Sequence, residues 1–337
     1  MADSSIRSRI SVALCTFNGE RFLPRQLASI QQQTRLPDEL VICDDRSTDT
    51  TLAIVRDFAS AVSFPVKVTQ NERNLGSTKN FENAMRLCSG DLIALSDQDD
   101  VWYPQRLARS EQELQSHPAA GLVFSDGEII DDEDRSTGAR MWPSTQFSVP
   151  RAEELLAGNY DLLLRYRFVT GATVMFRAPL RDSCLPIPAE WIHDEWLAAM
   201  VPAFADLRPI DEPLVRYRRH ASQQVGLQTE PIPQRQIKDH WDTLLGERSD
   251  KYWNKLSQDI EFAQAICNRL EGIPLDARGQ NILAGYQAWL RFALFRSRLP
   301  HRRIARFASV LKRYGWYRRH ASGLLSAAKD LVRSRPR

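Results

Sequence analysis

The sequence places three carboxylates within four positions, Asp97, Asp99 and Asp100, directly after a short apolar run. Carboxylates this close together raise one another's pKa and gain nothing from packing. Such a cluster is typical of a site that holds a cation, and oxygen ligands suit a hard divalent metal. A solvated acidic turn before a helix N-terminus explains the same residues, because the helix dipole also favours acids there. The cluster alone leaves both interpretations open.

Four short apolar runs, the last of which leads into this cluster, suit buried strands and are too short for helices. They lie at residues 10–14, 39–43, 66–69 and 92–95, and helical patterns separate them at about 21–34, 50–59 and 77–87. This alternation predicts βαβ units in a Rossmann-like, mixed but mainly parallel sheet that is flanked by helices. Ligands of such sheets bind beyond the carboxyl ends of the strands.

Three clusters of mostly polar residues follow these predicted strands, and we expect them to meet in one crevice. They are Thr16, Phe17 and Asn18, then Asp44 and Asp45, then Asp97, Gln98 and Asp99. The turn after the first predicted strand contains a single glycine, Gly19, and so lacks the G-x-G-x-x-G motif of dinucleotide-dependent hydride transfer. The phosphate-loop motif of NTPases, G-x-x-x-x-G-K-[ST], does not occur in the sequence. Both functions therefore lose their main support. In the remaining nucleotide-sized crevice, Asp45 would accept hydrogen bonds from a base or ribose, and Asp97 and Asp99 would hold a metal on a diphosphate.

Four motifs in this order resemble the family 2 glycosyltransferases of the GT-A fold, most of all bacterial rhamnosyltransferase-like members. They are residues 12–19 (VALCTFNG), 41–51 (VICDDRSTDTT), 74–76 (NLG) and 96–100 (SDQDD), and the resemblance covers about residues 8–226. It implies that Asp99, in the D-x-D motif, binds Mg²⁺ or Mn²⁺ on the donor diphosphate. The residues implied on the nucleotide side are Thr16, Phe17, Asn18, Asp45, Asn74, Lys79 and Asp97.

The resemblance also implies two residues further along the chain. Asp194, in the segment 191–198 (WIHDEWLA), takes the position of the general base, and His193 replaces the glutamate that is common before it. His220 takes the position of the histidine that completes the metal shell, and Arg218 and Arg219 beside it would neutralise diphosphate charge. Without the resemblance, an acid at a helix N-terminus is the favoured interpretation of Asp194, and an ordinary surface or core histidine is that of His220.

Two stretches between these motifs have simpler interpretations. The acidic segment 126–138 is rich in turn residues and is expected to be a solvated loop. Residues 168–177 predict a strand in which Gly171 permits a close backbone approach to a sugar, or only strand packing.

Composition indicates an ordinary globular protein, with 43% hydrophobic and 26% charged residues and no apolar run long enough for a membrane span. The five cysteines form no C-x-x-C pair, which favours buried free thiols in a reducing compartment and hence a cytoplasmic protein. The net charge of +3 conceals an asymmetry, because residues 289–337 hold fourteen Lys and Arg but a single acid, Asp330.

Helical patterns fill the chain after the motifs, at residues 241–245, 252–270 and 282–299 and in two further basic segments around 304–314 and 324–332. We therefore predict a catalytic domain at 1–228 and a helical region with a basic amphipathic tail at 229–337. The tail is expected to lie on an anionic membrane surface, or alternatively to dock on the catalytic domain; nucleic acid is the least supported partner, since no nucleic-acid module occurs.

The resemblance implies an inverting, metal-dependent glycosyltransferase of the hexosyltransferase type. Its donor would be a dTDP- or UDP-sugar, with L-rhamnose as the first candidate, and its acceptor a glycan or lipid-linked saccharide at the cytoplasmic face of the inner membrane in surface polysaccharide synthesis. A nucleotidyltransferase acting on a sugar phosphate and a non-catalytic carbohydrate-binding module remain alternatives.

Overall fold

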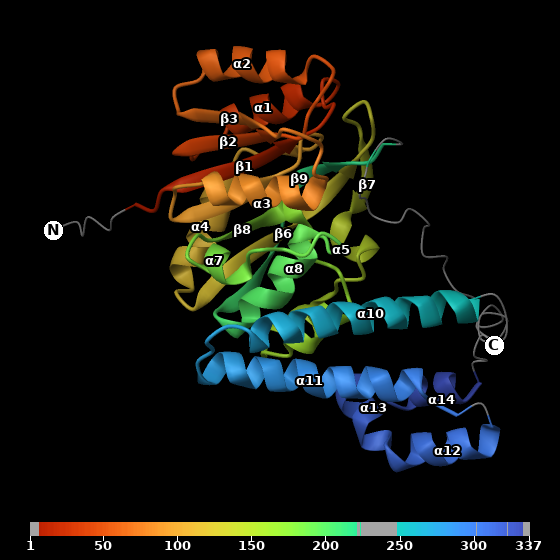
Figure 1. Cartoon of the computed structure of the whole chain (residues 1–337). Coiled ribbons are helices and arrows are strands. Elements are labelled where there is room, and N and C mark those ends of the chain that lie inside the picture. Colours follow the sequence, from red (N-terminus) through yellow and green to blue (C-terminus); the bar gives the residue numbers. More distant parts are fainter. Residues whose placement is uncertain (1–6, 221–222, 224–247, 301, 322, 333–337) are drawn as a thin grey trace. The chain divides into compact units, whose positions relative to one another are not determined.

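The computed structural model describes residues 7–220, 223, 248–300, 302–321 and 323–332. The chain divides into two compact units, residues 1–229 and 230–337. Figure 1 shows the sheet of the first unit and the helices of the second. The domain boundary predicted at residues 228 and 229 lies outside the described residues, so its position remains a proposal.

The first unit is built around one mixed nine-stranded sheet. Its strands are β1 (Ile10–Thr16), β2 (Glu39–Asp44), β3 (Val66–Gln70), β4 (Leu92–Ser96), β5 (Val101–Trp102), β6 (Ala120–Ile130), β7 (Ser136–Arg140), β8 (Val174–Arg177) and β9 (Asp206–Arg218). Its helices are α1 (Leu23–Gln31), α2 (Thr51–Ala61), α3 (Ser77–Leu87), α4 (Arg106–Ser116), α5 (Met141–Ser144), α6 (Val149–Leu156), α7 (Leu180–Cys184) and α8 (His193–Met200). Single 3₁₀ turns occur at η1 (Tyr160–Leu164), η2 (Gly171–Thr173) and η3 (Val201–Ala203).

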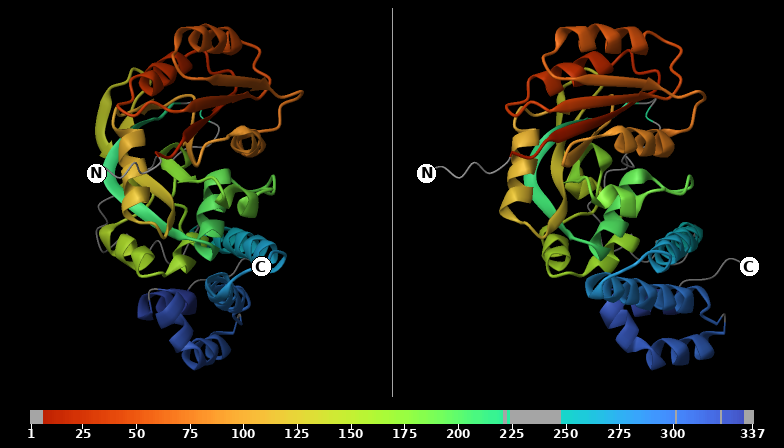
Figure 2. Two further views of the ribbon diagram at one scale, coloured as in Figure 1. Left: turned by 90° about the vertical axis from the view of Figure 1, so that its left-hand side faces the viewer. Right: turned by 60° about the vertical axis from the view of Figure 1, so that its left-hand side comes forward.

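The strand order is β3-β2-β1-β4-β8-β6-β9-β5, and β7 pairs with β6. The four strands predicted from the apolar runs form the parallel half, β3-β2-β1-β4. In the other half, β8 is antiparallel to both β4 and β6, whereas β6 and β9 are parallel. Helices lie on both sides of the sheet, with α3 on one side and α1 and α4 on the other (Figure 2). The prediction of a mixed sheet flanked by helices is confirmed.

Burial on both faces explains the composition of the central strand β1, ISVALCT, in which all seven residues are buried. The backbone of β1 pairs with β2 so that Thr16 lies beside Asp44, and with β4 so that Leu14 lies beside Ser96. The carboxyl ends of these three strands are therefore level with one another. This register brings the polar residues that follow each strand to the same edge.

Two local predictions are wrong. The acidic segment 126–138 is not simply a solvated loop, because β6 continues to Ile130 and forms a hairpin with β7. The buried side chains of Ile129 and Ile130 anchor that extension in the core. The strand expected at 168–177 is shorter, since residues Gly171–Thr173 form a 3₁₀ turn and only Val174–Arg177 pair as β8.

The second unit is helical, as expected, and consists of α10 (Arg248–Glu271), α11 (Ala277–Ser297), α12 (Arg303–Lys312), α13 (Tyr314–His320) and α14 (Leu324–Val332). Its small core contains Phe292, Leu299, Val310, Tyr317 and Ala327. The helix expected at 241–245 lies outside the described residues. None of the helices in the described ranges is long and apolar enough to span a membrane. All five cysteines are buried free thiols, as predicted.

Candidate active site

A cavity of about 390 Å³ opens at the carboxyl ends of β1, β2 and β4. Segments from distant parts of the sequence line it together: the turn after β1, the turn after β4, the start of α8 and the residues after β9. Among the residues singled out from the sequence, its lining includes Thr16, Phe17, Asn18, Asp45, Asp97, Asp99, Asp194 and His220. The expected convergence of polar strand ends in one crevice is therefore present.

Asp99 and His220 lie in direct contact on one wall of this cavity. The Nε2 atom of His220 is 2.8 Å from Oδ2 of Asp99, and the His220 ring packs against Phe22 with 4.7 Å between ring centroids. One carboxylate oxygen and one imidazole nitrogen fit a divalent ion such as Mg²⁺ or Mn²⁺. Within the described ranges, no set of three or more His, Cys, Asp or Glu side chains forms a metal cage. Any ion held here would therefore need further ligands besides the His, Cys, Asp and Glu side chains of the described residues.

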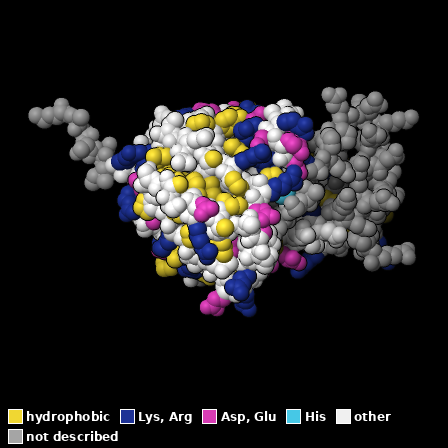
Figure 3. All heavy atoms as spheres, turned by 90° about the horizontal axis from the view of Figure 1, so that it is seen from above, with side chains coloured by type: hydrophobic (Ala, Val, Ile, Leu, Met, Phe, Trp, Pro, Cys, Tyr) yellow, Lys and Arg dark blue, Asp and Glu magenta, His cyan; other side chains and the backbone are white. Residues whose placement is uncertain are grey.

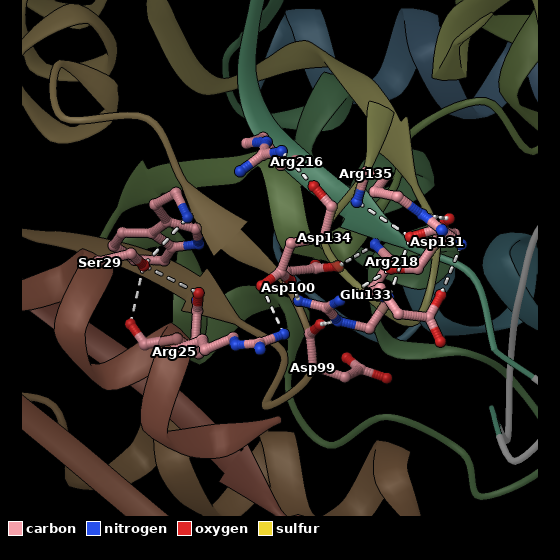
Figure 4. Close-up of polar contacts among 12 residues, drawn as sticks. Arg25, Ser29, Asp99, Asp100, Asp131, Glu133, Asp134, Arg135, Arg216 and Arg218 are labelled. Carbon is pink, nitrogen blue, oxygen red and sulfur yellow. Dashed lines mark hydrogen bonds and ion pairs between the residues drawn. The ribbon is translucent and has the colours of Figure 1, made fainter. Parts of the chain in front are cut away.

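Arg218 connects the acidic turn at Asp99 and Asp100 to residues 131–134, as Figure 4 shows. Its side chain is wholly buried and donates hydrogen bonds through Nε to the Asp99 carbonyl (2.7 Å) and through Nη1 to the Asp131 carbonyl (2.8 Å), and its Nη2 pairs with Asp134. Its backbone N–H donates to Oδ1 of the buried Asp100 at 2.9 Å. The expectation that Arg218 neutralises a diphosphate is wrong, since its guanidinium is committed to these protein groups and is absent from the cavity lining.

Gln98, which was expected in the crevice but without a role of its own, holds the turn after β1. Its Oε1 accepts from the Phe17 N–H at 2.8 Å, and its Nε2 donates to the Phe17 carbonyl at 3.0 Å. A side chain at Gly19 would collide with this amide, which is why a glycine suits that position. Asn18 adopts a left-handed backbone (φ 46°), and its Oδ1 accepts from the Thr48 N–H at 2.9 Å. Both contacts fix the backbone of the turn before a ligand enters.

The Asp45 carboxylate faces the cavity and also holds the loop after β3. Its oxygens accept hydrogen bonds from the N–H groups of Leu75 and Gly76 and from the Asn71 amide, each at 2.8 Å. A carboxylate offers about four lone-pair positions, so one remains for a ligand. Asn74 donates to the Asp45 carbonyl at 3.2 Å and is not part of the lining.

Lys79 also lies outside the cavity lining. Its Nζ donates to the Ile187 carbonyl at 2.5 Å and to Glu82 Oε2 at 2.9 Å. These contacts tie α3 to the segment before α8, and they give no geometric support to a nucleotide contact by Lys79.

Asp194 is held at the first turn of α8 by two backbone donors. Its Oδ2 accepts from the Gly171 N–H and its Oδ1 from the Glu195 N–H, each at 2.7 Å. Both hydrogen bonds fix the orientation of the carboxylate. The sharp turn η2 brings the Gly171 backbone to this position, and the Asp194 side chain lines the cavity. A fixed carboxylate at a cavity wall has the geometry of a general base.

His193 is a second residue whose position the sequence did not reveal. Its ring is 4% exposed, stacks on Phe81 with 3.9 Å between centroids, and lines the cavity. Neither ring nitrogen has a hydrogen-bond partner among the described residues. Burial lowers the pKa of His193, and the charge of the neighbouring Asp194 only partly opposes this lowering. A buried, neutral, unpartnered imidazole at a cavity wall is suited to contact a ligand.

The carboxylates give the cavity a negative character. Burial raises the pKa of Asp97, and the nearby charges of Asp99 and Asp194 raise it further. The buried guanidinium of Arg106, which donates to the carbonyls of Leu95 and Ala172, opposes this rise. A cation would offset the repulsion between these acids and an anionic ligand such as a diphosphate.

Comparisons with known proteins agree with this architecture. The family described as glycosyl transferase family 2 matches residues 11–181. The putative glycosyltransferase EpsE of Bacillus subtilis is 35% identical over 136 residues, which are 40% of this chain and 49% of EpsE. The Escherichia coli UDP-Glc:α-D-GlcNAc-diphosphoundecaprenol β-1,3-glucosyltransferase WfgD is 31% identical over 98 residues, which are 29% of this chain and 38% of WfgD. The chain thus spans half or less of the length of these two relatives.

The crystal structure of TarS residues 1–349 from S. aureus in complex with UDP-GlcNAc has a TM-score of 0.57 at 18% identity. The match covers 96% of this chain and 88% of that one. At this identity the likeness bears on the fold alone, and it agrees with a GT-A arrangement of the sheet and its helices. Since the family match extends over more than half of the residues, the chain belongs to glycosyl transferase family 2.

Proposed function

We propose that this chain transfers a sugar from a nucleoside diphosphate donor to a hydroxyl group of a glycan or lipid-linked acceptor, in the synthesis of a bacterial surface polysaccharide. One observation carries the proposal: a single cavity contains the fixed carboxylate of Asp194, the Asp99–His220 pair and the braced turn at Thr16–Asn18. Membership of glycosyl transferase family 2 supports the reaction class.

The nucleoside would lie against the turn after β1 and against Asp45. Gln98 and Asn18 hold that turn rigid, and the free lone-pair position of Asp45 suits an N–H of a base or a ribose hydroxyl. Asp97 would contact the ribose. A dTDP- or UDP-sugar fits the proposal, because TarS was crystallised with UDP-GlcNAc and the name of WfgD specifies UDP-Glc. The resemblance to rhamnosyltransferases makes dTDP-L-rhamnose the first donor to test.

The diphosphate would lie between the nucleoside and Asp194, beside Asp99 and His220. These two side chains would hold Mg²⁺ or Mn²⁺, which when bound offsets the negative charge that develops on the leaving diphosphate. The rigidity of this wall comes from Arg218, whose hydrogen bonds fix the backbone of Asp99 and, through Asp100, the end of β9.

Asp194 would accept the proton of the acceptor hydroxyl while that oxygen attacks the anomeric carbon. The two N–H groups of Gly171 and Glu195 hold the carboxylate in one orientation at the cavity wall, as a general base requires. Attack from the side opposite the diphosphate inverts the configuration at the anomeric carbon.

A lipid-linked acceptor would place the enzyme at the cytoplasmic face of the inner membrane as a peripheral protein. The similarity to WfgD, whose named acceptor carries a diphosphoundecaprenol lipid, supports this placement. Nucleic acid has no part in the proposal.

Two other functions explain less of the site. A nucleotidyltransferase acting on a sugar phosphate needs a cationic, glycine-rich loop for a triphosphate. The turn after β1 contains one glycine, Gly19, and the cation that follows it, Arg21, pairs with Asp132 at 3.0 Å. A non-catalytic carbohydrate-binding module has no use for a braced carboxylate beside a candidate metal pair.

Calorimetry of donor binding and a transfer assay test the proposal together. Asp194→Asn should bind the donor as the wild type does but lose transfer by about 10²–10⁴-fold, since it removes only the base. Asp99→Ala should lose the Mn²⁺-dependent part of donor binding. Asp182→Asn, an exposed acid on α7, is the matched control and should change neither. Equal donor affinity in Asp99→Ala and wild type would overturn the metal assignment, and full transfer by Asp194→Asn would overturn the base.

A further inference from the structure

Helices α12 and α14 expose five large hydrophobic side chains. On α12 these are Ile304 (88% exposed), Phe307 (57%) and Leu311 (65%), and on α14 they are Leu324 (73%) and Leu325 (56%). Because α12 packs against α14, we refer to these five exposed residues together as the α12–α14 apolar face. In the remaining described ranges only four large hydrophobic residues are exposed: Leu36 before β2, Val68 on β3, and Val149 and Leu156 at the two ends of α6.

The apolar face is separate from the side of α12 that packs inside the second unit. Ile304, Phe307 and Leu311 are spaced i, i+3, i+7 and so share one side of the helix. Arg306 and Val310 are buried, and Val310 lies in the core with Tyr317 of α13 and Ala327 of α14. One side of α12 therefore packs in the core of the second unit, and its other, apolar side is exposed.

The charges around this face are of one sign. Between residues 302 and 332 the exposed charged side chains in the described part of the chain are all basic: Arg302, Lys312, Arg313, Arg318 and Arg319. The only acid in that range, Asp330, is wholly buried and accepts hydrogen bonds from Arg296 (2.6 and 2.7 Å) and from the Tyr317 hydroxyl (2.7 Å). Elsewhere the surface is mixed: on the side of the first unit where α2 lies, acidic, basic and hydrophobic side chains are interspersed (Figure 3).

We propose that the α12–α14 apolar face docks on the surface of an anionic lipid bilayer. Large aliphatic and aromatic side chains bordered by cations match the interfacial region of such a bilayer, where apolar groups enter the acyl boundary and Lys and Arg meet the headgroups. A second copy of the chain docked through the same face would bring cations against cations, and a nucleic acid would leave five large apolar side chains in water. This proposal rests on the proposed function in one respect: the proposed function supplies the reason for docking, which is access to a lipid-linked acceptor.

Vesicle binding by the full chain tests this surface without any sugar transfer. We expect the wild type to sediment with vesicles containing about 30% phosphatidylglycerol, and to bind less to pure phosphatidylcholine vesicles or at high salt. The double variant Phe307→Ser, Leu311→Ser should bind the anionic vesicles at least about tenfold more weakly. The matched control Val149→Ser, Leu156→Ser removes two exposed hydrophobic residues of α6 and should bind as the wild type does.

Each other outcome contradicts the proposal. Equal vesicle binding by the α12 variant and the wild type would overturn it, as would equal binding to neutral and anionic vesicles. Self-association in the ultracentrifuge that the α12 substitutions abolish, without vesicle binding, would assign the face to a second copy of the chain. Calorimetry of donor binding distinguishes a failure of membrane docking from a failure of the proposed function. The α12 variant should bind donor normally, and Asp99→Ala should still bind vesicles.

Discussion

The Nε2 atom of His220 lies 2.8 Å from Oδ2 of Asp99, although 121 residues separate them in the sequence. The end of β9 creates this contact, because the Arg218 N–H bonds to Asp100 and the Arg218 side chain to the carbonyl of Asp99. Two residues later, His220 is therefore held against the acidic turn after β4. The candidate metal pair thus depends on a buried arginine that lies outside the cavity.

Replacing His220 by glutamine should weaken metal-dependent donor binding at least about tenfold, since glutamine removes the imidazole nitrogen but keeps a polar side chain. Calorimetric titration of UDP and dTDP with Mn²⁺, and again with a chelator, measures the effect. In the wild type the chelator should lower affinity, whereas in His220→Gln it should change little. His117→Gln, which alters a histidine at the end of α4 outside the cavity, serves as the control. A variant that retains the full chelator effect would exclude His220 as a ligand.

Replacing Arg218 by glutamine should destabilise the first unit by about 3–5 kcal/mol, because it leaves the buried partners of the guanidinium without their donor. Urea unfolding measures this loss. Arg216→Gln is the comparison, since Arg216 makes similar contacts, with Glu128 and the Asp134 carbonyl, but is only partly buried. Its loss should be no more than about 1 kcal/mol. Equal losses in the two variants would mean that burial of Arg218 contributes nothing special.

Much of the parallel half of the sheet could be predicted because each apolar run is bounded by polar turn residues, and the level strand ends follow from parallel pairing. The same reasoning placed Asp45, Asp97 and Asp99 in one cavity. It could not place Arg218, because the alternation of β9 does not show that β9 pairs with β6 or that Asp134 from the β6–β7 hairpin reaches its guanidinium. Nor could it find that Lys79 is committed to Ile187 and Glu82, since both contacts depend on tertiary packing.

Replacing His193 by phenylalanine should leave the protein as stable or more stable at pH 7.5, since phenylalanine preserves ring packing on Phe81 and removes two buried nitrogens without partners. If His193 contacts a ligand, the same variant should lose transfer activity. Thermal unfolding and a transfer assay on one preparation measure both. A variant that loses both stability and activity would make His193 a purely structural residue.

The pH dependence of stability should change in the same variant. The folded-state pKa of His193 is lowered because burial disfavours the imidazolium, while the unfolded chain has the ordinary pKa of about 6.5. The unfolded state therefore takes up a proton first as the pH falls, so that stability is present above about pH 6.5 and is lost below it. Thermal unfolding between about pH 7.5 and 5.5 should show a smaller loss in His193→Phe than in the wild type. Identical pH profiles would show that the pKa of His193 is not shifted.

Gly171 should tolerate no side chain without displacing the candidate base. An alanine Cβ at this position would lie 2.7 Å from Nε2 of His193 and 3.3 Å from Oδ2 of Asp194. His193 cannot retreat easily, because its ring is stacked on Phe81, so the backbone of η2 or the start of α8 must shift. A displacement of this size should lower kcat about a hundredfold with little change in donor affinity, because the nucleotide turn lies elsewhere in the cavity.

Gly285→Ala is the control for this substitution, since it lies in α11 with no atom within 4 Å of the new Cβ. It should raise stability by up to about 1 kcal/mol through helix propensity and leave kcat unchanged. Donor affinity and kcat measured on both variants separate a displaced base from a general loss of folding. If Gly171→Ala loses donor binding and kcat together, the turn at Gly171 supports the whole cavity rather than the orientation of Asp194.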